Sequence, residues 1–258
     1  MNKLILFVLT AAAVFSGNAA ERQPDETLFR GSGFQCRIFD QYRRNSGIMK
    51  LTIGEKTLIA GSRVYAAAKS ADGKEIALGE QSDPNFRWEN NILTNEKFLV
   101  PLKVKKENAE KYAKISHKIA FEQNRIIIGI TVSILKDFTL TKTWRTYTES
   151  LSIVTTSVIG MRISGTTLNG MPVLGVVPRK FERRKWGVGM YVKELELTDS
   201  EQFTMKVSAD QDCKLKFNHY GGKFIDLSIL PNIRQTELEQ KAGTEIRFGC
   251  NIEFKKPE

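Results

Sequence analysis

The feature that most constrains this 258-residue chain is an alternation of apolar and polar residues with a period of two. It runs through residues 115–121, 126–134 and 246–254. Successive side chains of a β-strand point to opposite faces, so each segment has the pattern of a half-buried strand. No helical apolar stripe is long enough to pack, and no βαβ rhythm is present. The sequence contains on the order of 15–18 such runs, which is more strands than a simple seven-stranded sandwich has. The sequence therefore predicts an all-β fold with little helix, a large antiparallel β-sandwich of two broad sheets.

The first twenty residues have the composition of a secretion signal. A basic start at residues 1–3 precedes an apolar run, 4–15, and small residues fill 16–20. That run is too short for a hydrocarbon core of about 30 Å. We therefore expect residues 1–20 to be a cleaved signal peptide of a bacterial periplasmic or secreted protein. Residues 21–258 should form a single β-sandwich domain without a transmembrane span, in which the polar residues 21–33 are a loose arm.

Three cysteines enter an oxidising compartment if the chain is exported. Cys36, Cys213 and Cys250 each fall on the apolar side of an alternating run. Their spacing does not match a metal site. A disulfide between Cys213 and Cys250 is one reading, because paired cysteines persist outside the cytoplasm. Three buried, unpaired thiols that pack as small hydrophobes are the other, and the spacing does not choose between them.

The charge of the chain favours acidic partners. Thirty-nine lysines and arginines against 29 acids give a formal net charge of +10. A basic exported protein can meet acidic polysaccharides, and its charge can equally serve solubility alone. Nucleic acid is disfavoured as a partner because no nucleic-acid-binding motif accompanies the charge. Nothing in the composition predicts the oligomeric state.

The basic and aromatic segment 178–187 is the most concentrated candidate for ligand binding. Guanidinium groups bind carboxylates in a forked geometry, and an indole face stacks on a sugar ring. A second aromatic and basic group lies at residues 144–147. The alternative is a solvated edge whose charges deter aggregation. The candidate ligand-binding residues are Arg179, Arg183, Arg184, Lys185, Trp186 and Tyr147.

Only two histidines are available for acid and base chemistry. His117 is in register with apolar neighbours, which indicates a hydrogen-bonded core residue. His219 lies at a strand end next to Tyr220, and the two form the candidate catalytic pair if the protein is an enzyme. No hydrolase, metalloprotease, phosphate-loop or calcium-loop motif is present. The sequence therefore indicates no metal or cofactor and leaves enzymatic activity uncertain.

Two segments resemble one family. Residues 112–132 (YAKISHKIAFEQNRIIIGITV) are similar to the long central hairpin of the galactose-mutarotase-like β-supersandwich, and residues 238–248 (LEQKAGTEIRF) to its closing turn and strand. The superfamily includes sugar epimerases and domains of polysaccharide lyases. The His-Gly-x-x-Arg element of the epimerases is absent, because Lys118 follows His117. The resemblance thus implies the scaffold rather than mutarotase chemistry.

Three functions follow as hypotheses. The first is an exported, non-catalytic carbohydrate-binding or glycan-handling protein that favours acidic polysaccharides. The second is a polysaccharide lyase or sugar epimerase that acts on uronic-acid sugars through His219 and Tyr220. The third is a structural envelope or assembly protein.

Overall fold

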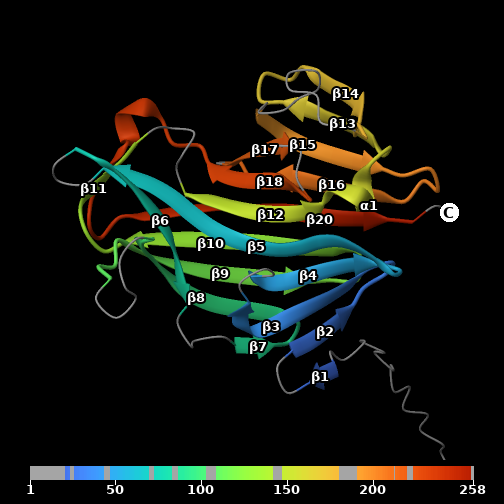
Figure 1. The fold of residues 1–258 in the computed structure, drawn as a ribbon, viewed down its shortest axis with the longest axis horizontal. Helices are drawn as coiled ribbons and strands as arrows, with labels where there is room; N and C mark the ends of the chain where they lie inside the picture. Colours follow the sequence, from blue (N-terminus) through green and yellow to red (C-terminus); the bar gives the residue numbers. More distant parts are fainter. Residues whose placement is uncertain are drawn as a thin grey trace, which may run out of the picture.

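The computed structural model describes residues 21–23, 26–43, 47–69, 73–82, 87–102, 109–141, 147–179, 191–211, 213–219 and 223–256. Almost all of the regular structure in these ranges is strand, which confirms the all-β class (Figure 1). The helical exceptions are one short helix, α1 (Thr155–Val158), and the 3-10 turn η2 (Gln235–Glu237).

The strands follow one another along the chain as β1 (Glu21–Gln23), β2 (Glu26–Arg30), β3 (Gln35–Arg43), β4 (Gly47–Ile53), β5 (Lys56–Lys69), β6 (Glu75–Ser82), β7 (Arg87–Glu89), β8 (Ile92–Pro101), β9 (Ala113–Phe121), β10 (Arg125–Ile134), β11 (Phe138–Leu140), β12 (Thr148–Val154), β13 (Arg162–Thr167), β14 (Pro172–Val176), β15 (Tyr191–Thr198), β16 (Thr204–Ala209), β17 (Cys213–His219), β18 (Phe224–Pro231), β19 (Glu239–Gln240) and β20 (Glu245–Lys255).

Antiparallel pairing joins these strands into one sheet that closes on itself. Starting at β5, the pairs run through β12, β18, β17, β15, β16, β20, β10, β9, β8 and β6 and return to β5. Eleven strands thus form a closed barrel with extra strands attached. The predicted sandwich of two separate sheets is not confirmed, because closure depends on pairings between strands far apart in the sequence.

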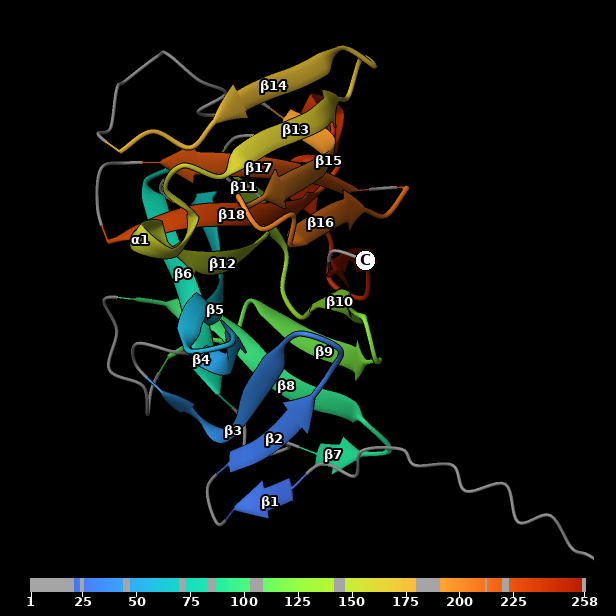
Figure 2. The same cartoon turned by 90° about the vertical axis from the view of Figure 1, so that its right-hand side faces the viewer.

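Short strands are added to the barrel by β7, which pairs with β8, and by β11, which pairs with β5 and β19. Two larger groups of strands also extend it (Figure 2). The meander β1–β2–β3–β4 joins β5, and β13 with β14 joins the edge of β15 that β16 leaves free. Residues 21–33, expected as a loose arm, contain β1 and β2 instead. Phe29 is buried and its ring lies 5.4 Å from that of Phe121, so apolar packing fixes this segment.

The predicted central hairpin and final strand are confirmed. β9 and β10 pair from Phe121 opposite Ile126 to Ala113 opposite Ile134, and β10 pairs with β20 on its other side. The alternate isoleucines of β10 are buried in the core. The residues between them face outward and are partly exposed, so β10 has one core face and one accessible face.

All three cysteines are free, buried thiols, which corrects the possible Cys213–Cys250 disulfide. Burial raises the pKa of Cys36 and Cys250 well above the ordinary value and that of Cys213 to about 12. Each thiol lies on the apolar side of its strand and packs as a small hydrophobe. The predicted signal peptide, residues 1–20, lies outside the described residues. Within the described ranges, no helix has the length and apolar character needed to cross a membrane.

Candidate functional site

A cleft of about 600 Å³ lies on the outward face of β5, β6, β12, β17 and β18, and we call it the cleft below. Cross-strand pairing places its side chains in rows. One row runs from Arg63 through Ser150 and Ser228 to Lys216. In the adjacent rows Tyr65 stands opposite Thr148, and Asp226 opposite Asn218. The rows gather groups that are distant in sequence on one surface.

Two titratable groups that line the cleft, Tyr65 and Lys216, and one beside it, Asp226, have shifted pKa values. Burial raises the pKa of Asp226 and outweighs the lowering by the charge of Arg63. Burial and the charge of Asp226 raise the pKa of Tyr65. Burial lowers the pKa of Lys216. Clusters of groups shifted by desolvation and by specific charge partners are typical of functional sites.

The cleft holds donors and acceptors suited to a polyhydroxylated ligand. Arg63 and Lys216 supply charged donors, and Asn218 and Ser228 supply both kinds of group. Beside the cleft, opposite Asn218, Asp226 supplies acceptor oxygens. Ser228 and Asn218 are buried and therefore fixed in place. Preorganised polar groups in a partly enclosed hollow bind small ligands more specifically than mobile surface groups do.

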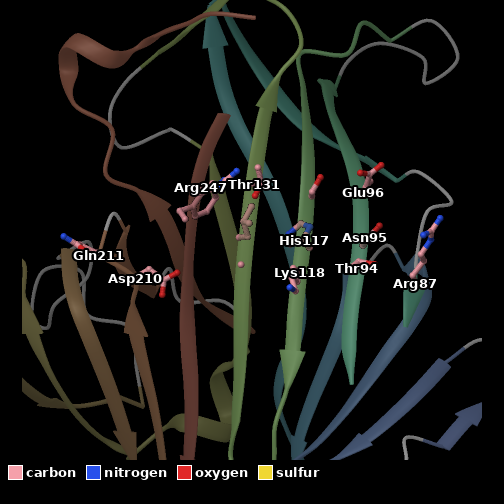
Figure 3. A pocket seen from close by; sticks show the side chains of 14 residues that line it. Arg87, Thr94, Asn95, Glu96, His117, Lys118, Thr131, Asp210, Gln211 and Arg247 are labelled. Atoms are coloured by element: carbon pink, nitrogen blue, oxygen red, sulfur yellow. The ribbon is translucent and has the colours of Figure 1, made fainter. Parts of the chain in front are cut away.

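A second hollow of about 790 Å³, called the groove below, crosses the outward face of β8, β9, β10 and β20 (Figure 3). Strand pairing places Glu96, Ser116, Thr131 and Arg247 in one row across it. The next row is Thr94, Lys118, Gly129 and Gly249. Arg87 from β7 and the turn residues Asp210 and Gln211 also line it, together with the buried residues Asn95, His117, Ile130 and Phe248.

Two buried ion pairs lie on the inward face, and each has one residue that also lines a hollow, His117 the groove and Glu80 the cleft. His117 Nε2 is 3.0 Å from Glu149 Oε2, and Lys97 Nζ is 2.7 Å from Glu80 Oε2. Burial alone would raise the pKa of Glu149, but the facing His117 and Lys97 hold it below its ordinary value. His117 is therefore a core residue bonded to a carboxylate, as its register predicts.

Two of the predicted ligand-binding residues lie in different surroundings, one in the core and one on the surface. Tyr147 is fully buried and its hydroxyl donates to Gln240 Oε1 at 3.0 Å, so its ring is part of the core and does not face a ligand. This corrects the expectation of a surface aromatic. Arg179 is exposed just after β14.

The other predicted site residues are not described. Arg183, Arg184, Lys185, Trp186 and Tyr220 lie outside the described residues. The backbone of His219 ends β17 opposite Ile225, next to the Asn218 end of the cleft. The placement of its side chain is not described. Their roles in binding or catalysis stay predictions.

Comparison with known proteins identifies solved structures that have a similar fold. No protein-family model and no curated protein matches the chain. Among solved structures, a putative aldose 1-epimerase from Escherichia coli K12 has a TM-score of 0.54 at 8% identity, covering 90% of this chain and 100% of that one. A galactose mutarotase-like protein from Lactobacillus casei has a TM-score of 0.55 at 9% identity, covering 89% and 100%. The fold is galactose mutarotase-like. A galactose 1-epimerase from Lactobacillus acidophilus is also similar, with a TM-score of 0.51 at 9% identity, covering 92% and 97%.

Sequence reasoning missed the residues that line the cleft of this galactose mutarotase-like fold. Thr148, Glu149 and Ser150 are three consecutive polar residues and all are buried, so the start of β12 shows no alternation of apolar and polar residues. A usable signal was the outward polar series of β17, in which Lys214, Lys216 and Asn218 alternate with apolar residues. It marks the face of β17 but not its neighbours.

Proposed function

We propose that the protein binds a carbohydrate in the cleft, favours acidic sugars and works after export from the cell. One observation carries the proposal: strand pairing places the cleft-lining Tyr65 hydroxyl and the cations Arg63 and Lys216 on one sheet face, with the Asp226 carboxyl beside them. Carboxylates and amides hydrogen-bond sugar hydroxyls, and a guanidinium binds a sugar carboxylate. The aldose 1-epimerase and mutarotase-like neighbours support a sugar ligand by analogy of fold.

Calorimetry with galacturonic acid and with galactose tests the proposal. We expect the acidic sugar to bind more tightly, because Arg63 and Lys216 have no counterpart to pair with on the neutral one. Arg63→Gln should remove the preference and leave weak binding to both sugars. Lys206→Gln changes a cation paired with Glu194 on β15, away from the cleft, and is the matched control. Binding of neither sugar by the wild-type protein would refute the proposal.

A sugar epimerase is the second candidate, favoured by the raised pKa of Asp226 beside Tyr65. Ring opening of an aldose requires one group to take the anomeric hydroxyl proton and another to protonate the ring oxygen. Two neighbouring groups with different pKa values can divide these roles. Polarimetry of freshly dissolved galactose or galacturonic acid decides: faster mutarotation that Asp226→Asn abolishes supports the enzyme. An unchanged rate supports binding alone.

The remaining alternatives have separate tests. A lyase that uses His219 and Tyr220 would generate an unsaturated uronate, measured by its ultraviolet absorbance. A purely structural role would leave the cleft without a ligand. Export is tested by fractionating cells that express the full chain, and a shortened product outside the cytoplasm supports cleavage after residue 20.

A further inference from the structure

Packing does not explain the glycine at position 129 in the floor of the groove. Gly129 lies in the middle of β10 and does not have a positive φ. A Cβ there would meet the carbonyl oxygen of Lys118 at 3.5 Å, an ordinary contact. Glycine weakens a strand interior, because it adds conformational entropy to the unfolded chain and packs no side chain. A ligand that approaches the backbone closely is one of the reasons for keeping such a glycine.

The neighbour of Gly129 is a glycine for a different reason. Gly249 faces it across β10 and β20. A Cβ on Gly249 would lie 2.2 Å from the carbonyl oxygen of Ile128 and 2.7 Å from Asp210 Oδ2, so packing itself requires glycine there. Together the two glycines leave a strip of bare backbone, bordered by the short side chains of Ser116 and Thr131. The floor is a shallow trough.

Cations border this trough on both sides. Lys118 on β9 and Arg87 on β7 form no ion pair with any described residue. On the other side, Arg247 on β20 makes an exposed pair with Glu245, at 3.1 Å, and no other ion pair with the residues that the structure describes. Exposed pairs of this kind contribute little and are readily exchanged for a ligand. Lys118 and Arg247 stand two strand spacings apart, which is about 10 Å across the sheet.

The acids of the groove are less available to oppose an anion. Glu96 is paired with Lys114 at 3.0 Å. Burial raises the pKa of Asp210, so this carboxyl gives up its charge more readily than an exposed one. The balance of the described lining therefore favours a negatively charged ligand.

We infer that the groove is a second saccharide site, in which an acidic polysaccharide chain lies across Gly129 with its carboxylates toward Lys118 and Arg247. The inference rests on the proposed function, and it adds a second point of contact for a longer polymer. The hydroxyls of Ser116, Thr131 and Thr94 match those of a sugar chain. Single-stranded nucleic acid and membranes fit less well, because no exposed aromatic or large apolar side chain is among the described lining residues.

Binding of polygalacturonate and of monomeric galacturonic acid separates the two sites. Gly129→Val fills the trough, and Ser133→Val places the same side chain on the same face of β10 outside the groove. Lys118→Gln removes one cation without touching the floor. We expect Gly129→Val and Lys118→Gln each to weaken polygalacturonate binding by at least about tenfold, the loss of one charge-assisted or steric anchor. Ser133→Val should bind like the wild type.

Binding of monomeric galacturonic acid serves as the second readout, because the monomer binds in the cleft and does not depend on the groove. It should be unchanged in Gly129→Val and lowered in Arg63→Gln. Equal polygalacturonate affinity in the wild type, Gly129→Val and Lys118→Gln would overturn the groove while leaving the cleft intact. A wild-type protein that binds neither polymer nor monomer would refute both sites. Single-stranded DNA that binds as tightly as polygalacturonate and loses as much in Gly129→Val would overturn the saccharide assignment.

Discussion

Replacing Lys97 by methionine should be among the most damaging single changes in the barrel. The side chain of Lys97 is fully buried, and its Nζ lies 2.7 Å from Glu80 Oε2, whose side chain is 5% exposed. Glu80 also accepts from the backbone N–H of Val64 at 3.1 Å, so it cannot turn away to water. The charge of Lys97 acts on Glu149 as well. Methionine keeps the volume and leaves two buried carboxylates short of a cation.

The size of the effect follows from the distance. At 2.7 Å and an effective dielectric constant near 20, the attraction between Lys97 and Glu80 is about 6 kcal/mol. Methionine also avoids the cost of burying the ammonium, so we expect a net loss of about 3–5 kcal/mol of unfolding free energy. Glu80→Gln should cost less, because Lys97 then still faces Glu149. Adding Glu80→Gln to Lys97→Met should restore about 1–3 kcal/mol, since it removes the stranded charge.

Urea denaturation of the four proteins of this cycle, followed by circular dichroism, measures these differences. Lys206→Met removes one partner of a half-exposed pair and should change the midpoint little. A double variant less stable than Lys97→Met alone would refute the reasoning, because the carboxylate would then not be the source of the penalty. A loss in Lys97→Met no greater than in Lys206→Met would do the same.

The stability lost in Lys97→Met should depend on pH in a direction that follows from the pKa of Glu149. In the wild type the pKa of Glu149 is lowered in the folded state, so its contribution is present above its ordinary pKa of about 4.5 and is lost as the pH falls through the lower folded value. Without Lys97 the folded pKa of Glu149 rises, and protonation relieves the stranded charge. The stability difference between wild type and Lys97→Met should therefore shrink as the pH falls toward 4.5.

Two further substitutions and one labelling experiment have expected outcomes. Gly249→Ala should lower the thermal midpoint by several degrees, since its Cβ would lie 2.2 Å from the carbonyl oxygen of Ile128; an unchanged midpoint in calorimetry would contradict this. Tyr147→Phe removes a buried 3.0 Å hydrogen bond to Gln240 and should cost about 1–3 kcal/mol in urea denaturation, whereas no loss would show that bond to be dispensable. The buried Cys250 thiol should resist iodoacetamide in the native protein and react only as the protein unfolds, and rapid native labelling detected by mass spectrometry would contradict its burial.

Local patterns predicted those strands that have one buried and one accessible face. Burial alternates along the whole of β10 and along β20 from Cys250 onward, and their pairing places Ile128 opposite Cys250, so both strands and the β9–β10 hairpin could be found from the sequence. The start of β12 gives no such signal, because its residues 148–151 are buried on both faces. The closed barrel is a property of pairings such as β5 with β12, about eighty residues apart, which no local pattern encodes.

The candidate sites could not be predicted for the same reason, because they too depend on pairings between distant strands. Asp226 and Tyr65 are unremarkable in sequence, and only the order β5–β12–β18 brings them to one surface. Tyr147 shares a predicted strand face with Arg145 and therefore resembled a surface group, yet it is buried against Phe138 and bonded to Gln240. The sequence shows that Gly129 lies on the outward face of β10 without a side chain. That it forms a trough depends on Gly249, which the pairing with β20 places beside it. Sequence alone gives the face of each residue and not its cross-strand neighbour.

The position of β20 in the barrel has a consequence for biosynthesis. Of the eleven barrel strands it is the last to leave the ribosome, and it fills the place between β10 and β16. Until then both of those strands present open backbone edges, which are the surfaces on which chains pair wrongly with one another. The nascent protein must therefore stay unfinished, and in need of chaperone protection, until its final ten or so barrel residues are made.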